Sequence, residues 1–422
     1  SGLCIVLLLL LFYLYLLTYR RKLLDNLRHI LFFTILMAII ISVSFLVLQY
    51  APVGYIYLIP FAWCPIIARV FYDSRTAIFV HLITVFIVSL AVPAPYLFLF
   101  IQALTGIIAV VSLRDMTQRA QLAQTAAFIF LSYCILYTAS TMLMAGSIAN
   151  VEYKYYFYFA INAVLVICAY GLIFLFERTF GLVSNITLVE LTNVNSNLML
   201  EFAEKAPGTF QHSLQVSNLA TEAAKRIGAK VLLVRTGALY HDIGKMAHPE
   251  FFIENQTGHN PLQDMPYDEA AKVIIEHVND GERIARKRRL PEVIVHFIKS
   301  HHGTSVTRYF YNTAVNEAIA NGKSAADVRK EDYMYPGPKP STKEAAILMM
   351  ADAIEARSRT LNTLTEQSIS DMVDQMIDAQ VADGQFAETK LSFKDLEDIR
   401  VVFKQKLIEI NHHRITYPTI TQ

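Results

Sequence analysis

An adjacent His–Asp pair is the feature of this 422-residue sequence that could most directly do chemistry. His241 and Asp242 close an apolar run and are followed by Gly244 and Lys245. The imidazole can bind a metal, the carboxylate can bridge two cations, and the ammonium can hold a phosphate oxygen. Residues of the same ligand types lie elsewhere in this half of the chain: His212, His277, His301, His302 and Asp352. Together they suit a two-metal site that activates water and polarises a phosphoryl oxygen.

The carboxylates and the histidine pair give the strongest indication of a metal. An Asp that follows an apolar run, such as Asp242 or Asp352, is costly to bury without a cation or a hydrogen-bond partner. Adjacent helical residues diverge by about 100°, so His301 and His302 can face one site only if the helix ends there. Gly303 supplies that ending.

For two further histidines, each taken alone, the sequence does not decide between a metal ligand and a structural role. His212 fits a polar residue in the first turn of a helix, and His277 fits a core histidine among apolar neighbours. The other histidines of this half lack comparable settings and are expected to be surface or packing residues: His248, His259, His296, His412 and His413.

The elements that must position these residues are helices. Helical periodicity recurs through the second half of the chain, and no run alternates convincingly as a strand. Helices are predicted over 210–227, 229–240, 266–289, 291–302, 305–321, 341–361 and 364–383.

An amphipathic stretch precedes these helices. Residues 183–202 predict one helix that leads from the first half of the chain into the second. It is either a solvated connector or a surface that packs against its copy in a homodimer. Pro207 and Gly208 then interrupt the helix, and Thr209 is the predicted N-cap of the next one.

The first half of the chain predicts a membrane domain. The sequence is 54% hydrophobic with a mean hydropathy of +0.37, and the apolar excess lies almost wholly before residue 180. Apolar segments of roughly spanning length occur at 3–17, 30–48, 55–70, 77–92, 96–113, 122–145 and 157–176. His81 is the clear ionisable candidate inside them. The first half of the chain serves either as a membrane anchor or as a sensor.

Basic residues predict the orientation of these segments. They gather in alternate loops: Arg20, Arg21, Lys22, Arg28, Arg69, Arg75, Arg114, Arg119 and Arg178. The intervening loops carry only Lys154. By the positive-inside rule the N-terminus lies outside and the second half is cytoplasmic.

Charge and cysteine content exclude some classes of protein. A formal net charge of +1 gives no reason to expect a nucleic-acid polymer as partner. The four cysteines lie in apolar runs without a CxxC motif or a disulfide-like spacing. Because the chain opens with Ser1 and lacks a signal-peptide pattern, a natural N-terminal part is expected to be missing.

The ordered ligand set resembles the HD phosphohydrolase superfamily, in the form that carries two metals. Several longer motifs resemble the bacterial seven-transmembrane HD proteins of the PgpH type: Ala206-Pro-Gly-Thr-Phe-Gln-His212, Tyr240-His-Asp-Ile-Gly-Lys245, Phe252-Ile-Glu-Asn-Gln256, His301-His-Gly-Thr304, Tyr309-Phe-Tyr311 and Tyr335-Pro-Gly-Pro-Lys-Pro340. The seven apolar segments extend the resemblance over most of the chain. Met334 stands where the family often has Arg, so any phosphate contact of that Arg is absent here.

The resemblance implies a membrane-anchored cyclic di-AMP phosphodiesterase that opens the ring to 5′-pApA in bacterial second-messenger turnover. The implied cofactors are two divalent transition metal ions, manganese or iron. The implied fold is all-α, with a seven-helix transmembrane bundle (1–180), a connecting helix (181–205), a cytoplasmic HD domain (206–390) and a C-terminal helix and tail (391–422). The implied location is the bacterial cell membrane, and the implied partners are cyclic di-AMP and the lipid bilayer.

The resemblance also implies roles for single residues. One metal would be held by His212, His241, Asp242 and Asp352, and the other by Asp242, His277, His301 and His302. Lys245 would hold a phosphoryl oxygen or assist proton transfer, although a surface cation at a helix end is the plainer interpretation. Arg359 lies two turns after Asp352 and is the next phosphate candidate. Tyr309 and Tyr311 could stack adenine, or could simply be core.

Two alternatives keep the same ligands. The domain could be a catalytically weak nucleotide-sensing receptor that relays binding to the membrane through residues 183–202. It could instead act on cyclic di-GMP or a guanosine polyphosphate. Against cyclic di-GMP, the segment after His302 lacks a Gly-Tyr-Pro signature.

Overall fold

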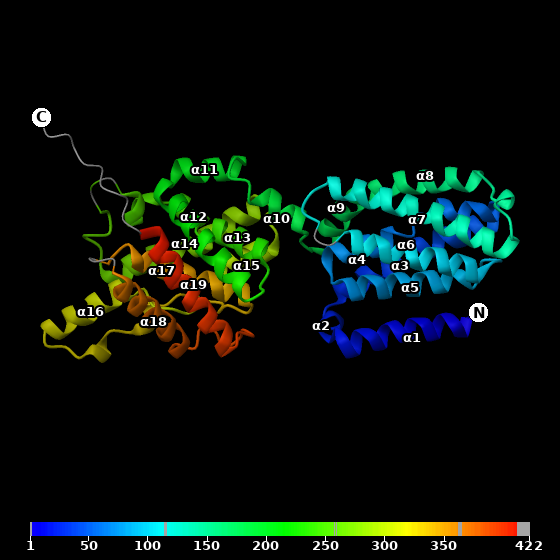
Figure 1. Cartoon of the computed structure of the whole chain (residues 1–422). Helices are drawn as coiled ribbons and strands as arrows, with labels where there is room; N and C mark the ends of the chain where they lie inside the picture. The colour runs from blue at the N-terminus through cyan, green and yellow to red at the C-terminus, as the bar shows by residue number, and fades with distance from the viewer. Residues whose placement is uncertain (1, 114–115, 257, 259, 362–364, 412–422) are drawn as a thin grey trace, which may run out of the picture. The chain divides into compact units, whose positions relative to one another are not determined.

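The chain folds into two compact units, Ser1–Thr187 and Leu188–Gln422 (Figure 1). The computed structural model describes residues 2–113, 116–256, 258, 260–361 and 365–411. Within those ranges the regular structure is helical, and an isolated antiparallel bridge joins Val306 to Met334. The predicted all-α fold is therefore confirmed.

The first unit is a set of apolar helices around a core of Phe, Ile and Val side chains. Its helices are α1 (Gly2–Tyr19), α2 (Arg21–Leu24), α3 (Leu27–Tyr50), η1 (Val53–Leu58), α4 (Trp63–Phe71), α5 (Ser74–Ser89), α6 (Pro95–Ser112), α7 (Ala120–Ala145), η2 (Ile148–Asn150), α8 (Lys154–Ile167) and α9 (Ala169–Phe180).

Each of the seven predicted apolar segments coincides with helical structure, but the helices differ in length. Among the described residues six helical stretches are long and apolar enough to cross a membrane: Gly2–Tyr19, Leu27–Tyr50, Val53–Phe71, Pro95–Ser112, Ala120–Met144 and Lys154–Phe180. The fourth predicted segment corresponds to α5, which has 16 residues and falls short of that length. The unit is therefore of membrane type, and a seventh span through α5 stays a prediction, as does the orientation.

The third apolar segment is broken, with η1 and α4 separated by a turn that contains Pro60. The side-chain amide of Asn162, on α8, donates to the Tyr57 carbonyl at 3.0 Å and to the Ile59 carbonyl at 2.8 Å. In apolar surroundings a backbone carbonyl freed by such a break needs a donor from elsewhere. Asn162 supplies donors to two of them.

His81 is buried inside this unit, with 1% of its surface exposed. Its Nε2 donates to the Gln102 carbonyl of α6 at 2.9 Å. A Cβ at Gly106 would lie 2.0 Å from that nitrogen, so glycine makes room for the ring. The Tyr133 hydroxyl of α7 donates to the Gln102 side chain at 2.7 Å. His81 thus belongs to a hydrogen-bonded packing cluster that joins α5, α6 and α7.

The second unit carries the helices predicted for the second half. They are α10 (Asn185–Leu191), which begins just before this unit, α11 (Asn197–Lys205), α12 (Pro207–Arg226), α13 (Val231–Tyr240), η3 (Ile243–Met246), η4 (Pro249–Phe251), η5 (Ile253–Asn255), α14 (Tyr267–Lys287), α15 (Glu292–Ser300), α16 (Arg308–Ala320), η6 (Ala325–Asp327), η7 (Lys330–Tyr333), α17 (Lys343–Ser358), α18 (Glu366–Ala382) and α19 (Phe393–Asn411).

The predicted single helix over 183–202 is wrong, because α10 and α11 are separated by a turn at 192–196. The Asn193 side chain accepts from the Asn195 N–H at 3.0 Å, and the Ser196 hydroxyl caps the start of α11. Asn and Ser side chains compete with helical hydrogen bonds in this way. The polar residues therefore end the helix although the apolar periodicity continues.

The core of the second unit lies between α12, α13 and α17, which pack on one another. Val216, Ala238 and Leu348 are buried there, and Ile377 of α18 and Phe403 of α19 extend the same core. The final helix thus packs with the helices that carry the candidate ligands. The domain boundaries inferred from the resemblance stay predictions. Arg114, Leu364 and the tail after residue 411 lie outside the described residues.

We expect Asn162→Ala to destabilise the first unit, since two carbonyls lose their donor at a cost of about 1–3 kcal/mol. Trp63 is the single tryptophan of the sequence, and its indole N–H donates to a backbone carbonyl of α8 at 2.8 Å. Its fluorescence during heating of the detergent-solubilised chain therefore reports on this unit. Asn312→Ala, on the exposed surface of α16, is the matched control. An unchanged Trp63 midpoint in Asn162→Ala would contradict the assigned role.

Candidate metal centre

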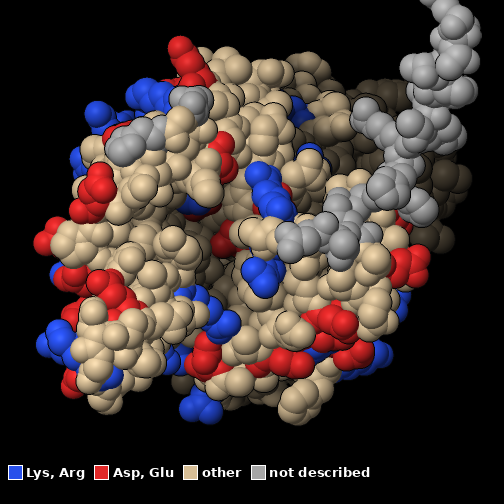
Figure 2. Space-filling model, turned by 90° about the vertical axis from the view of Figure 1, so that its left-hand side faces the viewer, with Lys and Arg blue, Asp and Glu red and all other residues tan. Residues whose placement is uncertain are grey.

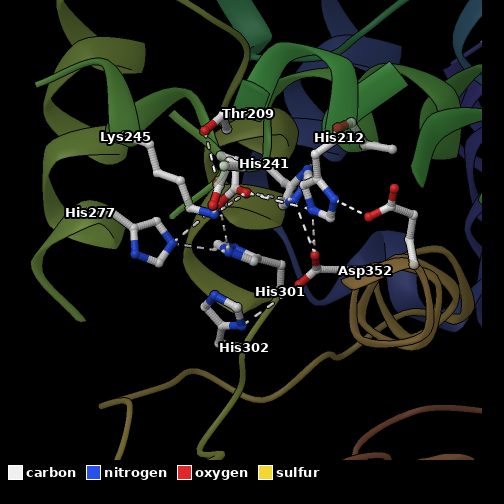
Figure 3. A network of polar contacts seen from close by, with 12 residues as sticks. Thr209, His212, His241, Lys245, His277, His301, His302 and Asp352 are labelled. Atoms are coloured by element: carbon white, nitrogen blue, oxygen red, sulfur yellow. Dashed lines mark hydrogen bonds and ion pairs between the residues drawn. The ribbon is translucent and has the colours of Figure 1, made fainter. Parts of the chain in front are cut away.

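Helices α12, α13, α14, α15 and α17 bring the predicted ligands to one place (Figure 3). One ligand each lies within α12, α14 and α17, and the two adjacent pairs follow directly on the ends of α13 and α15. The structure assembles all of the predicted set: His212, His241, Asp242, His277, His301, His302 and Asp352.

These residues form two groups that share one carboxylate. In each group every residue offers a ligand atom, and these atoms all lie within 4.8 Å of one another. The first group is His212, His241, Asp242 and Asp352, and the second is Asp242, His277, His301 and His302. This is the grouping that the resemblance implies, with Asp242 between the two.

Local backbone geometry explains how adjacent residues can share a site. α15 ends at Ser300, and Gly303 follows with φ +52°, a left-handed conformation that glycine adopts readily. The predicted helix end at the histidine pair is thereby confirmed. On the other side, a Cβ at Gly244 would lie 1.8 Å from the His277 carbonyl, so the His–Asp turn packs directly on the backbone of α14.

Three of the histidines are held in the same way. The Nδ1 atoms of His241, His277 and His301 donate to backbone carbonyls three residues earlier, at 2.7, 2.6 and 2.7 Å. A hydrogen bond of this kind fixes the tautomer and orients the ring. Each Nε2 is left with a lone pair directed into the centre.

Two buried polar atoms inside the centre lack a hydrogen-bond partner. His241 Nε2 and Asp242 Oδ1 are buried without a hydrogen bond. The Nε2 atoms of His277 and His301 face each other at 3.3 Å, although both carry lone pairs in this tautomer. Two lone pairs at that distance repel unless a cation lies between or beside them. The residues present therefore fit divalent metal ions.

The electrostatics of the centre also call for positive charge. Burial would lower the pKa of His241, but the carboxylates of Asp242 and Asp352 raise it to about 10. Burial would raise the pKa of Asp242, but the Lys245 ammonium and His241 hold it well below its usual value. Asp242 therefore stays ionised although only 1% of its surface is exposed.

Lys245 lies beside the shared carboxylate. Its Nζ is 2.8 Å from Asp242 Oδ2 and 3.0 Å from Glu254 Oε1. These two carboxylates outweigh burial and raise the pKa of Lys245, so the side chain remains an ammonium. The sequence missed Glu254 as a partner, although it belongs to the Phe252–Gln256 motif.

His212 is held by two carboxylates of one helix. Its Nδ1 donates to the Glu355 carboxylate, and its Nε2 lies 2.9 Å from Oδ1 of Asp352, which belongs to the same ligand group. Arg359 pairs with Glu355 at 2.6 Å, so its guanidinium is one residue removed from the ligands, and its role as a phosphate contact stays a prediction. Glu355 was missed by the sequence reasoning, although its spacing of three from Asp352 places both on one helix face.

The start of α12 corrects a further prediction. The N-cap position is Ala206 rather than Thr209, and α12 begins at Pro207. The Asn255 side chain accepts from the Gly208 N–H at 2.9 Å and from the Thr209 N–H at 3.1 Å. A residue distant in sequence thus satisfies the first helical N–H groups, which local sequence cannot reveal.

Tyr335 is an aromatic residue that lies beside the metal centre. Its ring lies 4.2 Å from that of His302, and it is 92% buried, with 8% of its surface exposed. Tyr309 is 74% exposed on α16, and Tyr311 packs against Tyr333. The predicted adenine contacts of Tyr309 and Tyr311 therefore stay predictions. Tyr335 belongs to the Tyr-Pro-Gly-Pro motif, which is the signal that could have identified it.

Open space reaches the centre from two sides. A cavity of 240 Å³ borders His301, His302 and Asp352, and one of 420 Å³ borders Gly244 and His277. Figure 2 shows a face of the molecule with a hollow near its middle and Lys and Arg side chains around the edge. Small molecules can thus reach the ligand atoms from solvent.

Comparison with known families covers both units. Residues 1–184 match the family described as a 7TM receptor with intracellular HD hydrolase, and residues 209–357 match the HD domain. Each match covers less than half of the chain, so residues 1–184 are similar to that membrane family and residues 209–357 are similar to the HD domain. The His241–Asp242 pair lies within the second match.

Two curated relatives of this chain are cyclic-di-AMP phosphodiesterases named PgpH. The protein of Listeria monocytogenes is 34% identical, over 86% of this chain and 50% of the relative. The protein of Bacillus subtilis is 32% identical, over 92% of this chain and 55% of the relative. The chain thus spans about half the length of these relatives. A crystal structure of the L. monocytogenes PgpH HD domain in complex with cyclic-di-AMP is 38% identical, matching 53% of this chain and 100% of that one with a TM-score of 0.49.

We expect Glu355→Ala to weaken metal binding, because His212 loses the carboxylate that orients its ring. Loss of such an outer partner typically lowers metal affinity about 10- to 100-fold. Equilibrium dialysis of the metal-stripped full chain against Mn²⁺ measures this. Glu344→Ala, in the first turn of the same helix, is the control. Equal affinities for Glu355→Ala and the parent chain would show that His212 needs no such support.

Proposed function

We propose that this chain is a membrane-anchored, metal-dependent phosphodiesterase that hydrolyses cyclic di-AMP to 5′-pApA. The observation that carries the proposal is the pair of four-residue ligand groups that share buried Asp242 beside Lys245. The two PgpH relatives, aligned over most of this chain, support the choice of substrate.

The ligand groups would hold two ions, of manganese or iron. Imidazole and carboxylate ligands suit these metals, and the described ligand groups contain no thiolate that would favour a softer ion. When bound, such ions supply a water of lowered pKa and neutralise charge on the phosphoryl oxygens. His212, His241 and Asp352 would hold one ion, His277, His301 and His302 the other, and Asp242 both.

The residues of the chain itself position the phosphate. Lys245 Nζ, held by Asp242 and Glu254, is placed to donate to a non-bridging oxygen at the shared carboxylate. In the proposed reaction one water adds to phosphorus, the bond to the 3′ oxygen breaks, and that oxygen takes up a proton. Fixed charges of this kind need little reorganisation during the reaction, which is how such sites lower barriers.

The membrane unit would anchor this activity at the bacterial cell membrane with the HD domain on the cytoplasmic side. Arg20, Arg69 and Arg178, which lie at or near the ends of the predicted spanning segments, support this orientation. Association as a homodimer is also part of the proposal. The turn at 192–196 limits any helix pairing to the separate segments α10 and α11.

The test of the activity is hydrolysis of cyclic di-AMP by the full chain in detergent, loaded with Mn²⁺ or Fe²⁺. We expect 5′-pApA as product, and we expect His241→Ala and Asp242→Ala to lower kcat/KM by at least about 10³-fold, as loss of a central member of a catalytic unit does. His296→Ala, a half-buried histidine of α15 outside both ligand groups and both cavities, is the control.

The outcomes separate the alternatives. Binding of cyclic di-AMP without product under any metal loading would favour a nucleotide-sensing receptor. A comparable kcat/KM for cyclic di-GMP or a guanosine polyphosphate would reject cyclic di-AMP as the specific substrate.

Metal stoichiometry tests the two-ion arrangement separately. We expect about two bound ions per chain, one in His277→Ala, and none retained firmly in Asp242→Ala, because Asp242 belongs to both groups. Elemental analysis after gel filtration measures this. Chelation should abolish hydrolysis, and added Mn²⁺ should restore it. Two ions in Asp242→Ala would contradict the bridging role.

A further inference from the structure

The 420 Å³ cavity on the His277 side of the centre has no place in the chemistry described so far. Val273 and His277 on α14 form one wall, and Phe251 and Phe252 form another. Because His277 is also a ligand of the second group, the cavity begins directly at the metal centre. Figure 3 shows Lys245 and His277 together on this side, away from Asp352.

The volume and the lining of the cavity suit an aromatic ring. The Phe252 ring is 5.8 Å from the His277 ring and 5.0 Å from Lys245 Nζ, so it spans from the ligands to the proposed phosphate contact. The Phe251 ring continues this wall outward and packs on His248 at 5.7 Å. Aromatic side chains of this kind can stack on any nucleobase. The volume is within the range of small-molecule pockets, about 300–1,000 Å³.

The charges of the lining favour a neutral base over a phosphate. Glu276 lines the cavity and would repel an anion, whereas Asp280, also in the lining, is paired with Arg283. Lys272, the basic residue at the rim, is exposed and paired with Asp268 at 3.4 Å. One oxygen of Glu276 accepts from the Asn279 amide at 2.9 Å, which leaves the other oxygen for an exocyclic amino group.

We propose that this cavity holds one adenine of the cyclic dinucleotide, stacked along Phe251 and Phe252 while its phosphate lies at the metal centre. The inference rests on the proposed function, and it assigns the base to the His277 side of the metal centre. The cavity beside Asp352 is smaller, at 240 Å³, and lies below the usual range for a bound small molecule. It is therefore the weaker candidate for a fully enclosed base.

The test fills the cavity without touching a ligand. Val273→Phe places a ring where the adenine would lie, and Phe251→Ala removes part of the stacking wall. We expect each change to raise KM for cyclic di-AMP at least about tenfold with kcat nearly unchanged, because base contacts persist from ground state to transition state. Hydrolysis of bis(p-nitrophenyl) phosphate, which has no base, should remain as in the parent chain.

Controls separate this effect from misfolding and from failure of the proposed function. Val401→Phe, at an exposed position of α19, is the matched substitution, and metal content and thermal midpoint are measured for every variant. Equilibrium dialysis of metal-stripped protein against cyclic di-AMP should show the same loss of affinity in Val273→Phe. If the parent chain cleaves only the p-nitrophenyl ester, the proposed function is wrong. The affinity for cyclic di-AMP measured by dialysis then tests by itself whether the cavity binds the base. Equal KM and Kd for Val273→Phe and the parent chain, or no binding to either, would overturn the assignment.

Discussion

The buried charge of Asp242 is the constraint on which the rest of the second unit depends. A carboxylate with 1% exposure is tolerable only if positive charge compensates it, and the Lys245 ammonium lies directly beside it. Glu254 fixes Lys245, and Asn255, its neighbour, caps α12, so the same short turn also places His212. The turn that positions Lys245 beside Asp242 thus also positions α12, the helix that carries His212.

Much of this could be predicted because the signals are local. The helices of the second unit follow from periodicity, and Gly303 marks the end of α15, beyond which His301 and His302 can face one site. The membrane character of the first unit follows from composition alone. Resemblance then grouped the ligands into two sets sharing Asp242, which spacing could not do, because the distances between helices are set by tertiary packing.

The features that could not be predicted from the sequence depend on contacts between distant segments, or on side chains that compete for backbone hydrogen bonds. Asn255 caps a helix that begins 48 residues earlier, at Pro207, so Thr209 was assigned a role that belongs elsewhere. Asn193 and Ser196 break the connecting helix through side-chain hydrogen bonds that periodicity ignores. In the first unit, Asn162 supplies hydrogen-bond donors to a broken segment about a hundred residues away.

The local charge of the centre argues for divalent rather than monovalent cations. Four carboxylates lie at or beside the ligands, from Asp242, Glu254, Asp352 and Glu355, whereas Lys245 and Arg359 provide two positive charges. His212, His241, His277 and His301 act as neutral ligands when Nδ1 carries the proton. The protein therefore contributes two uncompensated negative charges. Two divalent ions would reverse that sign and leave two positive charges, which equal the charge of the two phosphates in a cyclic dinucleotide. A substrate of that charge would complete a neutral site, whereas monovalent ions would leave the centre neutral before substrate arrives and give it no electrostatic reason to bind an anion.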